Sequence, residues 1–339
     1  MKCVVAVLTL AVVVGLLAAS GRALGSVNCA GSVCDVTTDS IEYRYFQNSA
    51  VTLRDYGVAT DGGGKHIVFT LIEAGSFGTA EPDEQGRTVS IIGSAASIET
   101  HDSAHATLIY RAAQPGSVTF TLDSGIGAVS LGNRAIVGDS QIIADLTITD
   151  GGMIEKSVDN LMVDLQTGDV LTFRVQGPAG SLGDSLASGD VHAELDVRTD
   201  GPVVNSDLTA FRGAANMTVD SISSDRASFS FSGLGTSPVV IIDFSNNLFA
   251  PFRDGMALKA DGQTLSRFDD VKDFLGSSEK GFVVAEGADY AEMLVRLDVQ
   301  SGSLTLEKTG FDPLLAIAAL MSITVCVAAA VFLFRRKTN

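Results

Sequence analysis

The sequence predicts a mainly β protein: an antiparallel β-sandwich, then a small α+β domain, then one C-terminal transmembrane helix. Short runs of alternating apolar and polar residues, separated by Gly, Asp and Ser, predict the sheets. A long uncharged run close to the C-terminus predicts the membrane helix. The chain of 339 residues is 46% hydrophobic and 19% charged. It is therefore long enough for two domain cores and too apolar for intrinsic disorder.

The first domain is expected over residues 26–200 as a β-sandwich. Its strand-like runs have a period of two and many β-branched residues, which is typical of strands. They lie at 41–45, 66–71, 106–110, 117–122, 141–148, 170–175 and 191–197, with turn signals at 61–64 and 150–152. This spacing of short strands favours a sandwich of jelly-roll or immunoglobulin-like kind.

The second domain is expected over residues 203–308, because the turn tripeptide Asp200–Pro202 closes the preceding strand and the pattern changes after it. Strands are predicted at 227–231 and 239–244. Ser266 and Asp269 have the spacing of a capping box, which predicts a short amphipathic helix directly after them. The segments 290–299 and 304–306 are predicted to form a terminal hairpin.

The two ends of the chain indicate export and anchoring. Residues 1–25 have a basic start, an apolar run and small residues before the expected cleavage point, as in a secretory signal peptide. The alternative is an uncleaved signal anchor. Residues 313–334 form an uncharged run that, as a helix, would span the roughly 30 Å hydrocarbon layer. The basic tail 335–339 then stays in the cytoplasm, which leaves the bulk of the chain extracellular in a single-pass cell-membrane protein.

The charge of the chain limits its partners. The formal net charge is −17, from 40 acidic and 23 basic residues, and several of the bases lie in the two ends. A surface of this kind repels nucleic acid and anionic lipid headgroups. Contact with membrane lipid is therefore expected only through the C-terminal helix. The partner expected for the exported part is an envelope or surface-layer component.

Cys29 and Cys34 are predicted to form a disulfide, because they are the two cysteines of the exported region. Cys3 and Cys326 lie in the apolar ends. Closing so short a loop contributes only about 2 kcal/mol by chain entropy, so the bond would fix the N-terminal segment without holding a core together. Two free thiols are the alternative.

A resemblance appears in the last third of the chain. It rests on the segments 261–265, 275–278, 281–284 and 293–297, and on Thr309–Phe311 before the apolar run and its basic tail. These segments resemble the membrane-proximal β-domain of archaeal cell-surface proteins. The end of the chain is similar to their Pro-Gly-Phe sorting tail, with Thr309 in the place of the proline. The resemblance implies an archaeal surface protein and supplies no catalytic residue.

Metal-ligand residue types cluster once in the sequence, at His101 and His105 with Glu99 and Asp102 nearby. Imidazole and carboxylate groups suit zinc-like ions. On a strand the four-residue spacing separates the two histidines by roughly 13 Å, so a shared ion requires a turn there. Two unrelated histidines in a solvated loop are the alternative. No organic cofactor is expected, and Ca²⁺ at Asp-Gly loops is the one ion that the acidic composition leaves open.

Two sequence patterns bear on catalysis. Gly183–Leu186 matches the serine block of lipase-like esterases, and Asp102 and His105 match its Asp-x-x-His partner, but their order along the chain is reversed and the setting is all-β. The acidic clusters 81–84 and 269–270 are candidates for a glycosidase pair, and solvated acidic faces are the favoured interpretation. No catalytic residue is therefore assigned.

Asn216 begins the N-x-Thr sequon and is the candidate glycosylation site. Taken together, the patterns predict a membrane-anchored cell-surface protein with a structural, adhesive or binding role in the envelope. An extracellular membrane-tethered hydrolase of esters or glycosides is the alternative.

Overall fold

In the computed structural model, the described residues are 26–309 apart from 32, 38–40, 47–50, 61–63, 75–76, 83–87, 102–104, 123–124, 140–142, 150–151 and 201; for 26, 37, 41–82 and 200 only the backbone is described. The predicted signal peptide (1–25) and membrane helix (313–334) lie outside these residues. Within the described ranges, no helix is both long enough and apolar enough to cross a bilayer. The described part is mainly β, with largely antiparallel sheets, as the sequence predicts.

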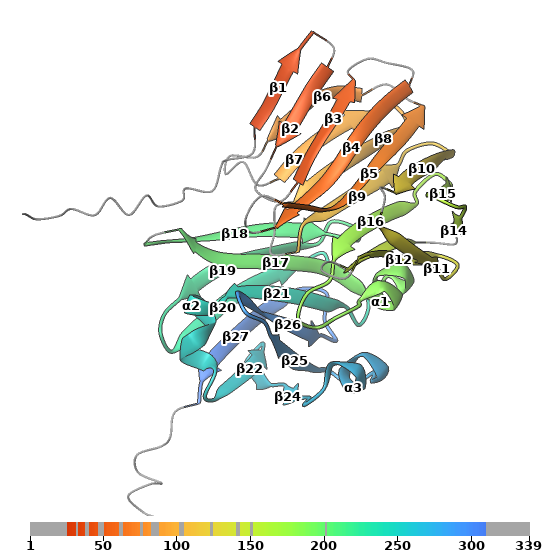
Figure 1. Cartoon of the computed structure of the whole chain (residues 1–339). Helices are drawn as coiled ribbons and strands as arrows, with labels where there is room; N and C mark the ends of the chain where they lie inside the picture. Colours follow the sequence, from red (N-terminus) through yellow and green to blue (C-terminus); the bar gives the residue numbers. More distant parts are fainter. Residues whose placement is uncertain are drawn as a thin grey trace, which may run out of the picture.

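The first half of the described chain forms two eight-stranded antiparallel sheets (Figure 1). Sheet 1 has the order β1-β2-β3-β4-β5-β10-β15-β14, and sheet 2 has the order β11-β12-β13-β16-β9-β8-β7-β6. Their bounds are β1 Ser26–Ala30, β2 Val33–Thr37, β3 Ile41–Phe46, β4 Val51–Thr60, β5 Gly64–Ala74, β6 Phe77–Pro82, β7 Thr88–Gly93, β8 Ala96–His101, β9 Thr107–Ala112, β10 Gly116–Leu122, β11 Gly127–Ser130, β12 Arg134–Gly138, β13 Ile143–Ile148, β14 Met153–Lys156, β15 Asn160–Leu165 and β16 Val170–Val175.

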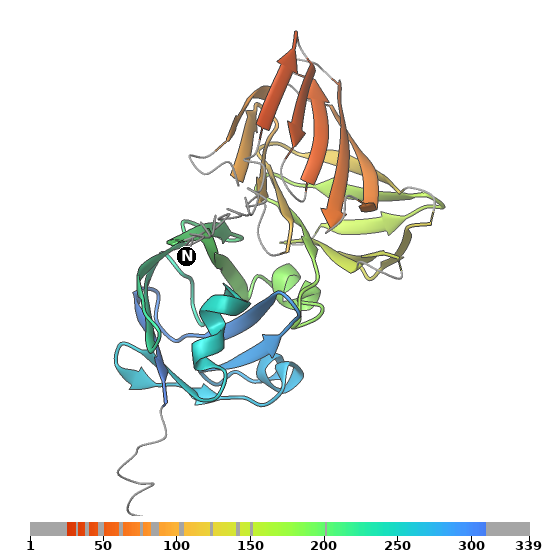
Figure 2. The ribbon, with the colours of Figure 1, turned by 60° about the vertical axis from the view of Figure 1, so that its left-hand side comes forward.

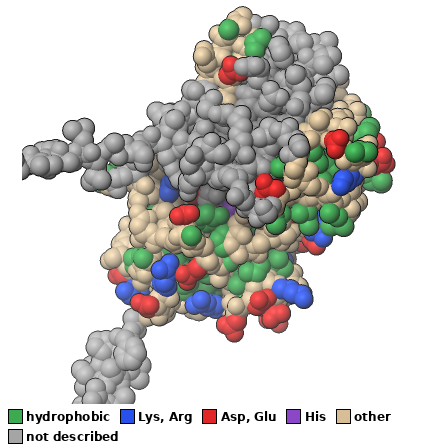
Figure 3. All heavy atoms as spheres, viewed as in Figure 1, with side chains coloured by type: hydrophobic (Ala, Val, Ile, Leu, Met, Phe, Trp, Pro, Cys, Tyr) green, Lys and Arg blue, Asp and Glu red, His purple; other side chains and the backbone are tan. Residues whose placement is uncertain are grey.

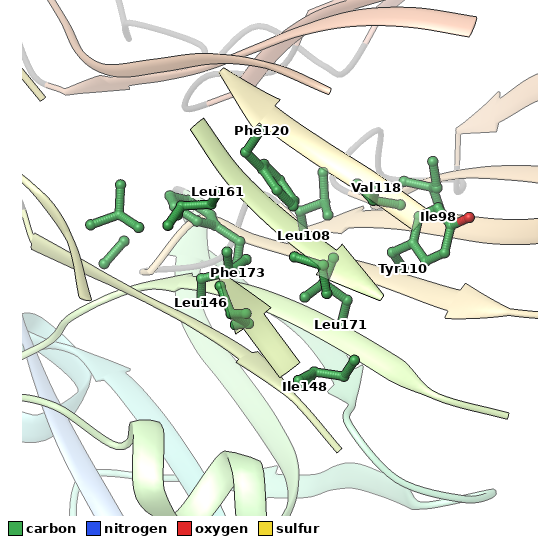
Figure 4. Packing of buried hydrophobic residues seen from close by; sticks show 14 of the residues in the cluster. Ile98, Leu108, Tyr110, Val118, Phe120, Leu146, Ile148, Leu161, Leu171 and Phe173 are labelled. Carbon is green, nitrogen blue, oxygen red and sulfur yellow. The ribbon is translucent and has the colours of Figure 1, made fainter. Parts of the chain in front are cut away.

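The inner faces of sheets 1 and 2 pack into one apolar core (Figure 4). Phe120 of sheet 1 and Phe173 of sheet 2 are among its largest fully buried side chains. Alternation explains the arrangement, because every second residue of β10 (Val118, Phe120, Leu122) is buried in this core. This half is therefore a β-sandwich.

The second half consists of a six-stranded and a five-stranded sheet with three short helices (Figure 1). Sheet 3 has the order β18-β17-β21-β26-β25-β24, and sheet 4 has the order β19-β20-β27-β22-β23. Their bounds are α1 Gly183–Ser188, β17 Val191–Asp200, β18 Val203–Ala210, β19 Asn216–Ile222, β20 Arg226–Ser232, β21 Val239–Ser245, α2 Asn246–Phe249, η1 Ala250–Phe252, β22 Met256–Ala260, β23 Gln263–Thr264, β24 Ser266–Arg267, α3 Val271–Gly276, β25 Gly281–Glu286, β26 Tyr290–Arg296 and β27 Gly302–Lys308.

The strand pairing of the second half differs from the sequence expectation at two places. β17, expected as the last strand of the first domain, pairs antiparallel with β18 and parallel with β21. The expected domain boundary therefore falls between two neighbouring strands of sheet 3. The expected terminal hairpin is also absent from the described pairing, because β26 lies in sheet 3 and β27 in sheet 4. Both strands carry the apolar residues that the core between these sheets requires.

The predicted short helix is present as α3, but its cap differs from the prediction. Asp270 caps it, accepting hydrogen bonds from the backbone N–H groups of Lys272 and Asp273. Ser266 instead lies in β24, which pairs parallel with β25. An aspartate directly before the first helical residue satisfies the free N–H groups as well as a serine does, so sequence spacing alone does not choose between them.

Sheets 2 and 3 lie between the two cores and face each other across the junction of the halves (Figure 2). Leu108 and Tyr110 of β9 point into the first core, whereas Ile109 packs with Ile241 and Leu294 of sheet 3. The central strands of sheets 2 and 3 are thus buried on both faces. Polar residues on the facing sides of these strands are consequently buried as well.

A buried charge cluster as candidate functional site

Three acidic side chains project from adjacent strands of sheet 3 toward sheet 2. Glu194 lies on β17, Asp243 on β21 and Glu292 on β26, and each is 0% exposed. The register places Asp243 directly opposite Glu292. Like charges opposite one another destabilise a sheet, so this arrangement requires compensating positive charge.

Arg174 of β16 supplies part of that charge from sheet 2. Its Nε donates to Glu194 Oε2 at 2.7 Å, and its Nη2 donates to Glu292 Oε1 at 2.7 Å. The arginine side chain is 1% exposed, and its third nitrogen, Nη1, is buried without a hydrogen-bond partner. Two fully buried ion pairs therefore tie the two halves together through a single guanidinium group.

His105 brings an imidazole into the same cluster. It immediately precedes Ala106, whose φ of +39° is a left-handed conformation that costs a non-glycine residue energy. Its Nε2 lies 3.3 Å from Asp243 Oδ1 and 3.7 Å from Glu292 Oε1. Its Nδ1 lies 3.2 Å from the hydroxyl oxygen of Tyr290, whose ring meets the imidazole edge-on.

The segment that connects the two halves closes over this cluster. A Cβ atom at Gly177 would lie 2.0 Å from His105 Cε1, so this position has room only for glycine. The backbone N–H of Ala179 donates to Glu292 Oε2 at 2.8 Å. Farther along, Asp145 of β13 accepts hydrogen bonds from the Ser181 hydroxyl at 2.8 Å and from the Leu182 N–H at 3.1 Å. The connection is therefore held at several points.

Burial and mutual charge shift the pKa values of the cluster in different directions. Burial raises the pKa of Glu194 to about 7, against the opposing effect of Arg174. Burial and the neighbouring charge of Glu292 raise the pKa of Asp243 well above its usual range. Burial opposes ionisation of Glu292 too, but Arg174 and His105 hold its pKa below the usual range. Burial and Arg174 lower the pKa of His105.

Glu194 and Asp243 are the pair whose ionisation is least compensated. Glu194 Oε1 and Asp243 Oδ2 are both buried without a hydrogen-bond partner as long as both groups are ionised. One ligand atom from each of His105, Glu194 and Asp243 lies within 4.8 Å of the other two. A shared proton or a metal ion would satisfy this arrangement, because each places positive charge between the oxygens.

A second polar cluster lies at the same junction, around His101. Its Nδ1 is 3.4 Å from Asp207 Oδ2 on β18, and its Nε2 is 3.9 Å from Glu99 Oε2 on β8. Thr88 donates from its hydroxyl to Asp207 Oδ1 at 2.9 Å. Burial alone would lower the pKa of His101, but the carboxylates of Asp207 and Glu99 more than offset it and raise the pKa to about 9.

The structure places the sequence-predicted metal residues in separate contact sets. His101 pairs with Glu99 and Asp207, whereas His105 joins Glu194 and Asp243. The two histidines remain candidate ligands, and only His105 belongs to a group with metal-ligand spacing among the described side chains. Their sequence neighbour Asp102 lies outside the described residues.

The remaining candidate residues do not belong to the two polar clusters at the junction of the halves. Ser185, from the esterase-like block, is in α1, and no hydrogen bond joins it to His105 among the described contacts. Asn216 opens β19 with an exposed side chain. Cys29 and Cys34 face each other in β1 and β2 and form a disulfide. Of the acidic pair 269–270, Asp270 serves as the cap of α3.

Sequence reasoning missed the acidic residues of the cluster. Glu194 belongs to an alternating strand whose polar face is normally solvated, and that face is buried here against sheet 2. A signal was present in β21, where Asp243 interrupts the otherwise apolar run 239–244. A lone carboxylate in a strand that is apolar on both faces indicates a buried, paired charge.

Comparisons with known proteins do not identify a family. No family model matches the chain, and no curated protein matches it. Among solved structures, a glycoside hydrolase family 81 protein from Clostridium thermocellum aligns with 84% of this chain at 10% identity and a TM-score of 0.40. The chain spans about a third (35%) of that protein's length. A similarity this low supports no inference about fold or function.

Proposed function

We propose that this protein is a membrane-anchored cell-surface protein with a structural, adhesive or binding role in the envelope. The observation that carries the proposal is that the described residues best suited to chemistry are buried and contact one another. His105, Arg174, Glu194, Asp243 and Glu292 are buried between two β-sandwich-like halves, where they bind one another. A catalytic site requires groups that reach a substrate, whereas these groups join the two halves.

The described surface carries an exposed apolar region, which we name the apolar seam: Val129, Leu131, Met153, Val158 and Met162. These side chains are exposed, and they lie on or beside β11, β14 and β15, where hydrophobic atoms gather at the right-hand edge of Figure 3. Exposed apolar groups that gather in this way are typical of protein contact surfaces. We propose another envelope protein as the component that covers the seam.

The anchoring part of the proposal is tested by topology. Protease added to intact cells is expected to degrade nearly the whole chain and spare only the anchor, because the basic tail 335–339 keeps the C-terminus inside. Survival of the full-length protein in cell envelopes that admit protease would contradict it. Peptide mass spectrometry of native membranes tests the associated proposal that Asn216 carries a glycan, which a wholly unmodified peptide would reject.

The binding part is tested by crosslinking in native envelopes. The double variant Met153→Gln/Met162→Gln is expected to lose crosslinked partner, because polar groups in the apolar seam weaken contact without altering the core. Ile92→Gln, another exposed apolar position that lies outside the seam on β7, is the matched control and should retain partner. Equal crosslinking by all three proteins would overturn this role for the seam. Hydrolysis of esters or glycosides by the purified full-length chain would favour the hydrolase alternative.

A further inference from the structure

We propose that His105, Glu194 and Asp243 bind one divalent transition-metal ion, of the zinc or manganese type, at the junction of the two halves. The proposal does not depend on the cellular role suggested above. It assigns to these residues a structural metal centre, in which the ion completes the contact between sheets 2 and 3.

Geometry is the first support. The three residues come from separate parts of the fold: the turn before β9, strand β17 and strand β21. One nitrogen and two carboxylate oxygens nevertheless converge within 4.8 Å of one another. Ligand bonds to zinc are about 2.0–2.2 Å long and zinc sites are tetrahedral, so ligand atoms around one ion lie about 3.4 Å apart. Rotations of the three side chains that move each ligand atom by roughly an ångström or less bring the atoms to that spacing.

Unsatisfied polar atoms are the second support. Glu194 Oε1 and Asp243 Oδ2 have no hydrogen-bond partner, although both side chains are 0% exposed. Buried carboxylate oxygens without partners are costly, and proteins rarely retain them. A bound cation would give each oxygen the partner that the polypeptide does not provide.

Formal charge is the third support. Glu194, Asp243 and Glu292 carry three negative charges when ionised, and Arg174 supplies one positive charge. A neutral imidazole adds none, and Asp196 is already paired with Arg198. The cluster is therefore short of two positive charges, which is the charge of one divalent cation. Isolated charge of that size is not tolerated in a site without water.

The surroundings of His105 fit the role of a ligand. Metal-binding histidines commonly donate the N–H of the second ring nitrogen to an oxygen, which fixes the tautomer. In His105 the Tyr290 hydroxyl oxygen is 3.2 Å from Nδ1 and can accept its N–H, and in that tautomer the lone pair of Nε2 is available to an ion shared with Asp243.

The mixed donor set selects the class of ion. Ca²⁺ and Mg²⁺ prefer sites made wholly of oxygen ligands, and Ca²⁺ takes six to eight of them. One imidazole with two carboxylates suits Zn²⁺, Mn²⁺ or Fe²⁺ instead. Because the cluster is closed to solvent, the ion enters as the two halves come together during folding and exchanges slowly afterwards.

The test begins with the full-length chain purified without chelator. Its bound metals are counted by inductively coupled plasma mass spectrometry, and about one equivalent of Zn²⁺ or Mn²⁺ is expected. The chain is then unfolded in urea with chelator and refolded with or without added Zn²⁺. Refolding with the ion is expected to raise the thermal midpoint by about 5 °C or more. Folded chain that carries less than about a tenth of an equivalent, and that does not bind added Zn²⁺ or Mn²⁺, would overturn the proposal in favour of a shared proton.

Variants and a spectroscopic probe identify the ligands. Glu194→Gln and Asp243→Asn keep the side-chain shape and are expected to lower bound metal about tenfold or more. Glu286→Gln, in an exposed ion pair with Arg253, is the matched control and should retain the metal. If the buried variants fail to fold, the ligands are tested with Co²⁺ bound to the unaltered chain. X-ray absorption spectroscopy of that protein should then detect one histidine nitrogen together with oxygen ligands. An all-oxygen shell, or restoration of the midpoint by Ca²⁺ alone, would contradict the assignment.

Discussion

His101 and His105 lie four residues apart in the chain, are both buried at the junction of the halves, and both face carboxylates, yet their pKa values shift in opposite directions. The pKa of His101 is raised to about 9, and that of His105 is lowered. Arg174 accounts for the difference. Beside His105 this arginine already pairs with Glu194 and Glu292 and repels a second positive charge.

The comparison shows that a buried histidine takes its charge state from the whole cluster and not from its nearest acid. At His101 the carboxylates of Asp207 and Glu99 flank the ring and favour its protonated form, although Arg111 also pairs with Glu99. At His105 the carboxylates outnumber the single arginine, but that arginine and full burial keep the ring neutral. Both sites leave buried polar atoms without a hydrogen-bond partner: Nε2 of His101 and Oδ2 of Asp207 at the first, and Oε1 of Glu194 and Oδ2 of Asp243 at the second.

Removing Arg174 should have the largest effect on stability. Arg174→Met leaves Glu194 and Glu292 buried without their partner, and breaking a buried pair in this way costs about 3–5 kcal/mol. Urea unfolding of the purified chain measures the loss. Arg253→Met removes the exposed pair with Glu286 and should cost less than about 1 kcal/mol. Equal losses in the two variants would mean that the cluster does not join the halves.

The same variant also tests the cause of the opposite shifts. In metal-free protein, removal of the guanidinium group should raise the pKa of His105, because the repelling charge is gone, while the pKa of His101 should stay the same. Histidine ring signals in NMR titrations of the unaltered chain and of Arg174→Met measure both values. No change at His105 would show that burial alone lowers its pKa.

The pH dependence of stability should depend on the other histidine site, at His101. The folded pKa of about 9 lies above the unfolded value of 6.5, so folding favours the protonated ring. The stabilisation is fully present below pH 6.5 and is lost as the pH rises through about 9. By linkage the total is up to about 3 kcal/mol.

Urea unfolding at pH 6 and pH 9.5 measures this dependence in the unaltered chain and in His101→Gln. The unaltered chain should lose stability over this interval, and the variant should lose less, because glutamine does not titrate. His192→Gln is the control, since the pKa of His192 is lowered by burial and by Arg212. A variant as pH-dependent as the unaltered chain would place the titrating group elsewhere.

Much of the architecture follows from residue patterns, and the cluster does not. Alternation and turn residues predict strands in both halves, such as β10 and β21, because those signals are local, but they do not predict others, such as β7 and β15. Which sheets stack on each other is not a local property of the sequence. The polar side of β17 would be solvated if sheet 2 were not stacked on it. The pairing of Arg174 with Glu292, 118 residues away along the chain, has no sequence signature. Only Asp243 signalled burial, by its place in an apolar run.

Adding a methyl group at Gly177 should have an intermediate effect, confined to the His105 site. The new Cβ would lie 2.0 Å from His105 Cε1 and 2.7 Å from Glu292 Oε2, so the imidazole must move. Overpacking of this kind costs about 1–3 kcal/mol. Gly276→Ala is the control, because nothing lies within 4 Å of its Cβ. The His101 ring signals should stay unchanged in Gly177→Ala, and a change there would show that the two sites are coupled.

Replacing Glu99 should have the smallest effect, because this carboxylate is about a third exposed and lies 3.9 Å from His101. Solvent screens such a pair, so Glu99→Gln should cost about 0.5 kcal/mol in urea unfolding at pH 6. The pKa of His101 should fall but stay above 6.5, since Asp207 is closer and almost fully buried. A fall below 6.5 in the NMR titration would make Glu99 the principal partner. The contrast between the two histidines would then rest on a solvent-exposed acid instead of on the contact between the halves.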